Sequence, residues 1–331
     1  MSFDQKPEKH FILVGEALGM LVPSSDSSKQ GFLKNSYELT VAGAESNVAT
    51  HLSRLGHKTT YISRVGGDYV GEAIINFLNF QGVDASFVEV DHARQTGIAV
   101  KEISKAGTIV RYYRSQSAAR ELNNSMVGTL TDLQPDYVHM SGITAAISPS
   151  ANEFLRSAIN RLQGVSQISF DINFRPILWK TPPYDEMLEI ANLTNICFVG
   201  LDEANAVWGV RDADEVRKLV HRPEYLIVKM GAEGSKIFHP GGTDRVSALQ
   251  LQVVEPVGAG DAFAAGFLHG LVNKMTPRDS ARFGTILASE SLLTTSDVGE
   301  LPEKSYIESL LRLSEGDWKL TQFESTGRLR S

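Results

Sequence analysis

The stretch "ESNVATHLSRLGHKTTYISRVGGDYVGEAIINFLNFQG", residues 45–82, decides the fold class. Residues 45–56 have the apolar spacing of a helix and end at Gly56, a residue type that commonly terminates helices. Residues 59–66 form a strand-like apolar run, and residues 68–82 have the Asp start and Gly stop of a second helix. Alternating strands and helices with short connections predict a parallel, doubly wound sheet covered by helices on both faces.

The same alternation extends on both sides of this stretch. Further strands are expected at 11–16, 137–142, 167–173, 196–200, 225–231, 234–239 and 251–256. Further helices are expected at 149–163, 184–193, 202–208, 213–220, 260–273 and 277–293. We therefore expect an α/β fold with three layers, an α/β/α sandwich, in a single domain over residues 1–331.

The alternation breaks between about residues 87 and 115. Here "TGIAVKEI" and "TIVRYYRS" flank "SKAG", which is the pattern of a β-hairpin. A hairpin in an α/β chain usually lies outside the main sheet. Together with residues 31–43, which alternate in places like a strand, it predicts a small separate sheet inserted into the α/β core.

The composition limits the kind of partner. The 331 residues are 42% apolar and 21% charged, with a net charge of −7 and no basic tract, which argues against nucleic acid as the main partner. No run approaches the ~20 apolar residues of a membrane span, and the first ten residues lack the apolar core of a signal peptide. A single cysteine, Cys197, excludes a disulfide within the chain. We expect a cytoplasmic protein that binds a small molecule.

Polar residues follow the predicted strands. Because ligands of open α/β sheets bind at the carboxyl ends of the strands, these residues predict the rim of an active site. They are Glu16, Ser141, Asp171, Asn173, Arg175, Asp202, Glu203, Lys229 and Asp261.

The stretch "EPVGAGDAFAAGFLHGL", residues 255–271, predicts an anion-binding site. Gly258, Ala259 and Gly260 lead directly into a helix, whose first turn offers unpaired N–H groups and the positive end of the helix dipole. A dinucleotide fingerprint would need a glycine where Phe263 stands, and no Walker-type sequence occurs.

Asp261 follows this turn, and two interpretations of it remain open. It could simply cap the helix, as Ser or Thr would do equally well. It could instead accept the proton of an attacking hydroxyl in phosphoryl transfer, with the turn holding the charge of the transferred group. Near a helix N-terminus we expect its carboxylate to stay ionised at neutral pH, as a base must.

Two stretches resemble a known family. "PVGAGDAFAAGFL", residues 256–268, resembles the C-terminal signature of the ribokinase (PfkB-type) sugar kinases, and "AGAESNVATHLSRLGHKTTYISRVGGD", residues 42–68, resembles the N-terminal one. The resemblance covers about residues 11–298. It implies a ribokinase-like doubly wound domain, with a small β-sheet lid built from segments of about 31–43 and 95–115. It also implies an ATP-dependent kinase that uses Mg²⁺.

The resemblance implies roles for individual residues. Asp261 matches the catalytic base, and Gly258, Ala259 and Gly260 match the anion hole. Glu203 matches the residue that helps to hold the magnesium-bound nucleotide through water. The implied nucleotide-binding residues are Asp171, Asn173, Lys229, Gly231 and Gly234. Gly43 and Asn47 match sugar-binding positions.

Three further stretches are similar to 2-keto-3-deoxygluconate kinases: "RYYRSQSAA" (111–119), "HMSGIT" (139–144) and "DINFRPILW" (171–179). This likeness implies that Tyr112, Arg114 and Arg175 contact the substrate, and that Asp297 in "TTSDVG" does so too. A sugar acid carries a carboxylate, which a guanidinium can hold through two hydrogen bonds. We therefore expect phosphorylation of the primary hydroxyl of 2-keto-3-deoxygluconate to give its 6-phosphate.

Several alternatives stay open. Ala99 in "TGIAV" fits fructokinases better, and Tyr112 with Tyr113 could sandwich the base of a nucleoside. A sugar-sensing protein without catalysis could keep the same fold, and Arg111, Arg114 and Arg120 could be an exposed charge cluster.

Two expectations concern partners. Glu255 stands where the family usually has Asp or Asn, so the resemblance does not decide whether the protein has a potassium site. Lid strands present unpaired edges, so we expect a homodimer, or a higher oligomer, formed through the lids.

Overall fold

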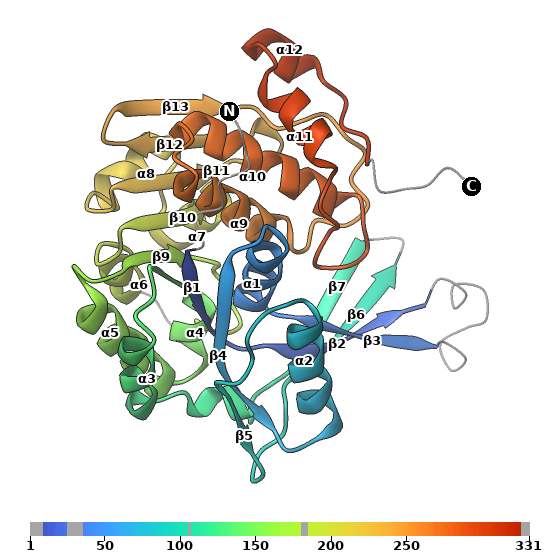
Figure 1. Ribbon diagram of the computed structural model, residues 1–331, viewed down its shortest axis with the longest axis vertical. Helices are drawn as coiled ribbons and strands as arrows, with labels where there is room; N and C mark the ends of the chain where they lie inside the picture. The colour runs from blue at the N-terminus through green and yellow to red at the C-terminus, as the bar shows by residue number, and fades with distance from the viewer. Residues whose placement is uncertain (1–8, 25–35, 105–106, 180–184, 326–331) are drawn as a thin grey trace.

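The computed structural model describes residues 9–24, 36–104, 107–179 and 185–325, and these residues form two sheets. The larger is nine-stranded within this described part, in the order β13-β12-β11-β10-β9-β8-β1-β4-β5 (Figure 1). Its strands are β1 (His10–Val14), β4 (Lys58–Gly66), β5 (Val88–Asp91), β8 (Tyr137–Ser141), β9 (Gln167–Asp171), β10 (Ile196–Gly200), β11 (Tyr225–Lys229), β12 (Ser235–His239) and β13 (Gly242–Val246). Neighbouring strands pair parallel from β5 to β11, whereas β12 pairs antiparallel with both β11 and β13.

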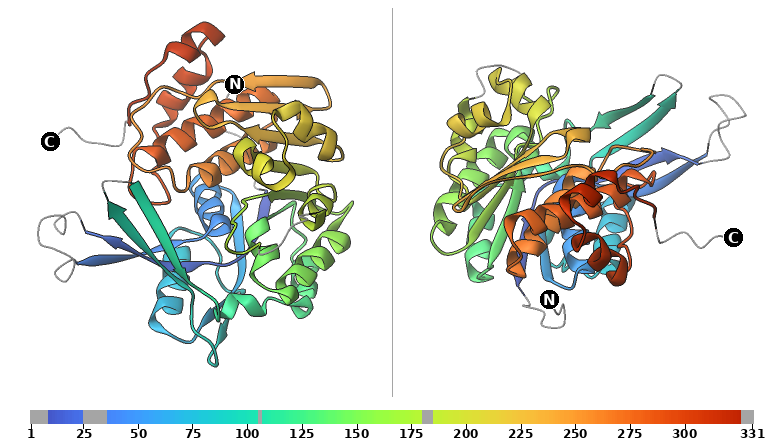
Figure 2. Two further views of the ribbon diagram at one scale, coloured as in Figure 1. Left: turned by 180° about the vertical axis from the view of Figure 1, so that it is seen from behind. Right: turned by 90° about the horizontal axis from the view of Figure 1, so that it is seen from above.

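Helices cover both faces of this sheet, as the predicted sandwich requires (Figure 2). One face packs against α1 (Ala44–Arg54), α2 (Tyr69–Phe80), α9 (Ala259–Val272), α10 (Pro277–Leu292), α11 (Lys304–Leu311) and α12 (Glu315–Leu320). The other face packs against α3 (Val127–Asp132), α4 (Gly142–Ile147), α5 (Pro149–Leu162), α6 (Asp185–Ala191), α7 (Leu201–Trp208) and α8 (Ala213–Leu219). None of the described helices is long and apolar enough to cross a bilayer.

Strand β1 shows why a continuous apolar run forms a central strand. Successive side chains of a strand point to opposite faces of the sheet. Phe11 and Leu13 are therefore buried in the core on one face, while Ile12 and Val14 are buried in the core on the other. Because β1 is covered by helices on both faces of the sheet, its sequence from Phe11 to Val14 is continuously apolar and does not alternate between apolar and polar residues.

The second sheet is the lid. It contains β2 (Leu18–Pro23), β3 (Tyr37–Ala42), β6 (Ile98–Ser104) and β7 (Gly107–Tyr113), in the order β3-β2-β6-β7, and projects from one side of the α/β core (Figures 1 and 2). Residues 31–35 of the predicted first lid segment lie outside the described residues. Strand β2 follows β1 after only three residues and was not predicted, because the apolar run from 11 to 22 contains no strong turn signal.

The predicted strand at 251–256 is wrong. Val253 and Val254 are 53% and 54% exposed, and the backbone N–H groups of Val254 and Glu255 donate to the Leu292 carbonyl oxygen at 2.8 and 3.3 Å. The segment is therefore tied to the end of α10 instead of entering the sheet. The edge position is taken by β13, which pairs with β12.

Helices α9 and α10 pack closely because glycines face each other. A Cβ on Gly266 would lie 2.7 Å from the Cα of Gly284, and a Cβ on Gly284 would lie 2.7 Å from the carbonyl oxygen of Phe263. The small residues after Asp261 therefore serve packing. The same contact explains why position 284 is a glycine. It fixes the axis of α9 and therefore the position of the N-terminus of α9.

Candidate active site

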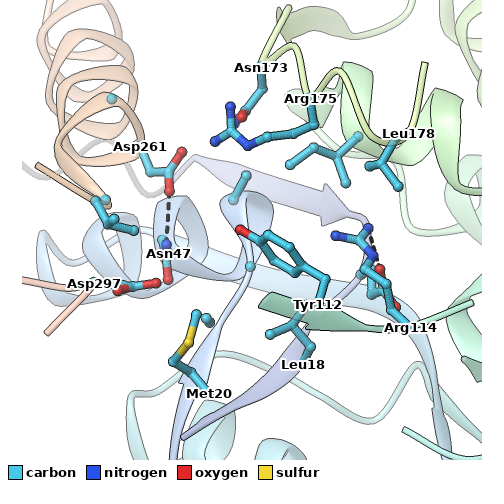
Figure 3. Close-up of a pocket in the computed structure, with 18 of the residues that line it drawn as sticks. Leu18, Met20, Asn47, Tyr112, Arg114, Asn173, Arg175, Leu178, Asp261 and Asp297 are labelled. Atoms are coloured by element: carbon cyan, nitrogen blue, oxygen red, sulfur yellow. Dashed lines mark hydrogen bonds and ion pairs between the residues drawn. The ribbon is translucent and has the colours of Figure 1, made fainter. Parts of the chain in front are cut away.

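A pocket of about 570 Å³ lies where the lid meets the carboxyl edge of the large sheet (Figure 3). It collects most of the side chains predicted from the sequence. Those that line it are Gly43, Asn47, Tyr112, Arg114, Asn173, Arg175, Glu203, Lys229, Gly258, Gly260, Asp261 and Asp297. Ala259, Asp171, Gly231 and Gly234 do not line it.

The N-terminus of α9 opens into this pocket. Gly258 is its N-cap, with a left-handed φ of 82°, and a Cβ there would lie 2.7 Å from the carbonyl carbon of Asp297. Only glycine fits both demands. The Ala262 N–H donates to the Gly258 carbonyl at 3.0 Å and closes the first turn, so the preceding N–H groups have no intrahelical acceptor. This geometry is an anion-binding site.

Asp261 lies beside this turn and is joined to the other signature. The Asn47 side chain on α1 donates to Oδ2 of Asp261 at 2.8 Å, across 214 residues of sequence (Figure 3). Burial raises the pKa of Asp261 to about 8, although the Asn47 hydrogen bond opposes the rise. The expectation that the helix end keeps Asp261 ionised at neutral pH is therefore wrong, because burial outweighs it.

Lys229 places a positive charge at the same turn. It lies at the end of β11, and a Cβ on Gly260 would be 3.3 Å from its Nζ. Nζ donates to Oδ2 of Asp171 at 2.7 Å. Burial works against the ammonium, but the carboxylates of Asp171 and Glu203 outweigh it and raise the pKa of Lys229. Asp171 therefore orients Lys229 and does not itself face the pocket.

Glu203 is fixed by two backbone groups. Its Oε2 accepts from the Gly200 N–H at 2.9 Å, and its Oε1 accepts from the Phe174 N–H at 3.1 Å. Burial raises its pKa, and Lys229 opposes this rise. The guanidinium of Arg175 lies 3.7 Å from Oε1, so Arg175 already lies beside an acid at the pocket edge.

Arg114 is also already paired. Its guanidinium contacts the carboxylate of the buried Glu16, which in turn accepts a hydrogen bond from Ser117, and it lies over the Tyr112 ring at 5.6 Å from the ring centroid (Figure 3). Arg120 lines the pocket too, and its guanidinium makes no hydrogen bond or ion pair with any residue that the structure describes. Sequence reasoning did not place Arg120 in the site.

Gly231 and Gly234 form the turn between β11 and β12. Their φ angles are 55° and 96°, and a Cβ on Gly234 would collide with the backbone of Val246. The shape of the turn therefore requires glycine at Gly234, whatever binds beside it. The predicted contact of this turn with a nucleotide stays a prediction.

The chain is similar in sequence to known proteins. The family model described as pfkB family carbohydrate kinase matches residues 9–304. The 2-dehydro-3-deoxygluconokinase of Thermoproteus tenax is 30% identical over 285 residues, which cover 83% of this chain and 86% of that protein. The 5-dehydro-2-deoxygluconokinase of Geobacillus kaustophilus is 28% identical over 329 residues, which cover 94% of this chain and 96% of that protein.

Solved structures agree in fold. The 2-dehydro-3-deoxygluconokinase of Thermotoga maritima has a TM-score of 0.82 at 21% identity, covering 92% of this chain and 98% of that one. A fructokinase of Vibrio cholerae, solved with fructose, ADP and potassium ion, has a TM-score of 0.77 at 21% identity, covering 92% of this chain and 99% of that one. The ribokinase-like fold is confirmed, and the match over most of the chain identifies it: the protein belongs to the pfkB family of carbohydrate kinases.

Proposed function

We propose that this carbohydrate kinase transfers the γ-phosphoryl group of ATP to the primary hydroxyl of a keto-deoxygluconate, with 2-keto-3-deoxygluconate (2-dehydro-3-deoxygluconate) as the preferred substrate. The product would be its 6-phosphate. The observation that carries the proposal is Asp261, which lies at an anion-binding helix N-terminus and is hydrogen-bonded to Asn47 at 2.8 Å. The names of the two relatives, both acting on a keto-deoxygluconate, support the choice of substrate.

In the proposed reaction, Asp261 accepts the proton of the substrate hydroxyl as the hydroxyl oxygen attacks the γ-phosphorus. The bond from that phosphorus to the leaving oxygen of ADP breaks in the same step. The N–H groups of the turn at 258–260 and the ammonium of Lys229 stabilise the charge on the transferred group. Asn47 holds the carboxylate in line with the pocket.

Glu203 fits a water-mediated contact with Mg²⁺. Both of its carboxylate oxygens already accept backbone N–H groups, and its side chain still lines the pocket. The described residues contain no cluster of three or more His, Cys, Asp and Glu side chains that could hold a metal ion alone. We therefore propose that phosphate oxygens supply most ligands of Mg²⁺, which neutralises their charge. Use of ATP agrees with the expected cytoplasmic location.

The pocket suits a substrate with a carboxylate at the end remote from the reacting hydroxyl. Asp261 and Arg114 lie on opposite sides of the pocket (Figure 3). The carboxylate of Glu16 already balances Arg114, whereas Arg120, which also lines the pocket, has no partner among the described residues and supplies an uncompensated positive charge. A neutral ketohexose, the alternative substrate class, has no group that needs this charge.

A panel of acceptors tests the substrate class. We expect turnover of 2-keto-3-deoxygluconate in a coupled ADP-release assay, with lower kcat/KM for 5-keto-2-deoxygluconate, fructose and adenosine. Replacing Arg120 by Gln removes a charge-assisted hydrogen bond and should raise KM for the sugar acid about tenfold while sparing fructose. The exposed Arg111, which pairs with Glu102, provides the control variant Arg111→Gln. Turnover of ketohexoses without any sugar acid would refute the proposed substrate.

Asp261→Asn tests the proposed base. The amide keeps the shape and the hydrogen-bonding capacity of the side chain but cannot accept a proton. We expect kcat to fall by about three to five decades, with sugar affinity measured by calorimetry nearly unchanged, because the base acts in the transition state. Unchanged turnover would favour the non-catalytic sugar-sensing alternative.

The pH dependence follows from the pKa of Asp261. A base with a pKa of about 8 is protonated and inactive below that pH, so kcat/KM should rise as pH increases through about 8. Asn47→Ala removes a hydrogen bond that favours the ionised form of Asp261. The rise of kcat/KM should therefore move to higher pH in this variant. A rate that stays flat from about pH 6 to 9 would contradict the assignment.

We further propose a homodimer that forms through the lids. The lid edges expose apolar side chains, among them Leu39 on β3 and Ile109 and Tyr113 on β7. Ile109→Asp should convert a dimer, measured by light scattering at micromolar concentration, into a monomer. Val165→Asp, at a residue 72% exposed on the α/β core, is the control and should leave the dimer intact. A monomeric wild-type protein would rule out the lid interface.

A further inference from the structure

Lys101 is a fully buried cation in the lid. It belongs to β6, and its side chain is 0% exposed. Its Nζ lies 3.2 Å from Oδ1 of Asp297, 3.3 Å from the carbonyl oxygen of Thr295 and 3.8 Å from Oε2 of Glu255. An ammonium group has three N–H donors, and here three oxygens surround it.

This cluster forms the wall of the anion-binding turn. Glu255 is 3% exposed and precedes Gly258 by three residues. Asp297 is 8% exposed, and its backbone packs so closely against Gly258 that only glycine fits there. Thr295 and Asp297 belong to one loop after α10. Lys101 therefore connects the lid to both segments that hold the turn in place.

A cation is required at this position. Two carboxylates buried side by side repel each other, and one of them takes up a proton unless a positive charge lies between them. Burial raises the pKa of Asp297, the ammonium of Lys101 opposes this rise, and Glu255 reinforces it. Without Lys101, the wall beside the phosphate site would carry unbalanced negative charge.

A monovalent metal ion is the other way to supply such a charge, and a potassium ion is present in the solved Vibrio cholerae fructokinase. Hard cations of this kind bind carboxylate and carbonyl oxygens. In this chain the oxygens of Glu255, Thr295 and Asp297 already surround an ammonium group. A potassium ion therefore does not fit among them.

We propose that Lys101 is a positioning residue whose ammonium group braces the anion-binding turn in place of a monovalent metal ion, so that phosphoryl transfer does not require potassium. The proposal rests on the kinase reaction described above. It adds to that reaction a charge that the protein itself supplies from the lid.

The first experiment needs no variant. ADP release by the wild-type enzyme, with ATP and 2-keto-3-deoxygluconate, is measured in potassium chloride and in tetramethylammonium chloride at the same ionic strength. Equal kcat in both salts is expected. Strong activation by potassium would overturn the proposal, whereas a wild-type enzyme that turns over no sugar in either salt would instead count against the proposed function.

Lys101→Ala then tests the brace. The loss of the ammonium should lower kcat on the order of 100-fold through misplacement of the turn, with a smaller effect on KM. Potassium or ammonium ions should restore part of kcat, because the oxygens of Glu255, Thr295 and Asp297 become free to bind them, and tetramethylammonium should not. A loss of activity that no small cation relieves would mean a merely structural lysine. Full activity without added cation would equally contradict the proposal.

Glu102→Gln is the matched control. Glu102 is the next residue on the same strand, and its side chain forms an ion pair with Arg111 at 2.6 Å on the exposed side of the lid. This variant should keep the wild-type kcat in both salts. A potassium response in Glu102→Gln would mean that the effect comes from the lid in general and would refute a specific role of Lys101.

A readout independent of activity covers the case of an unstable variant. Potassium should raise the Tm of Lys101→Ala but leave that of the wild type unchanged, because a ligand stabilises only the form that binds it. If Lys101→Ala does not fold, the triple variant Lys101→Met/Glu255→Gln/Asp297→Asn replaces the ammonium group and both carboxylates with neutral groups of similar size. It should fold, show low kcat and gain nothing from potassium. Wild-type kcat in the triple variant would overturn the proposal.

Discussion

The site depends on one constraint: the N-terminus of α9 must open into the pocket with its backbone unobstructed. The contact of Gly266 with Gly284 fixes the helix axis, and Gly258 makes the left-handed turn that exposes the N–H groups. The wall behind the turn is the backbone at Asp297, which leaves no room for a Cβ. Asp261, Asn47 and Lys229 are arranged around that helix end.

Charge in the pocket is arranged in pairs. Lys229 is held by Asp171, Arg114 by Glu16 and Lys101 by Asp297, and in each pair the acid is buried. A buried cation without a partner is costly, so each acid stabilises its cation and fixes its position. Asp261 differs, since an uncharged amide holds it and burial raises its pKa to about 8. This pKa agrees with the role of proton acceptor that we propose for Asp261.

Much of the fold could be predicted from the sequence because its signals are local. Helix starts, glycine stops and apolar runs predicted the sandwich, and two short signatures predicted the family and five of the residues that line the pocket, Gly43, Asn47, Gly258, Gly260 and Asp261. The apolar run at 251–256 gave a false strand, since a run of that kind does not reveal that its N–H groups bond to α10.

What the sequence could not reveal depends on distant pairings. Lys101 lies 196 residues from Asp297, and in "GIAVKEI" it reads as an ordinary surface lysine of a lid strand. The pairing of Arg114 with Glu16 is likewise distant in sequence, and it leaves Arg120 as the arginine of the two without a partner among the described residues. The protonation of Asp261 depends on how deeply the fold buries it, and a helix start alone carries no information about depth.

The position of Lys101 on β6 also limits how the lid can move. A lid that only covers a substrate could lift away from the core as a free flap. The lid of this protein carries Lys101, whose ammonium group balances the buried carboxylates of Glu255 and Asp297. Separating the lid from the core would leave these three charged groups buried without partners. The Lys101 cluster therefore ties β6 to the loop after α10 and to the segment that precedes the anion-binding turn, and it opposes a motion of that kind.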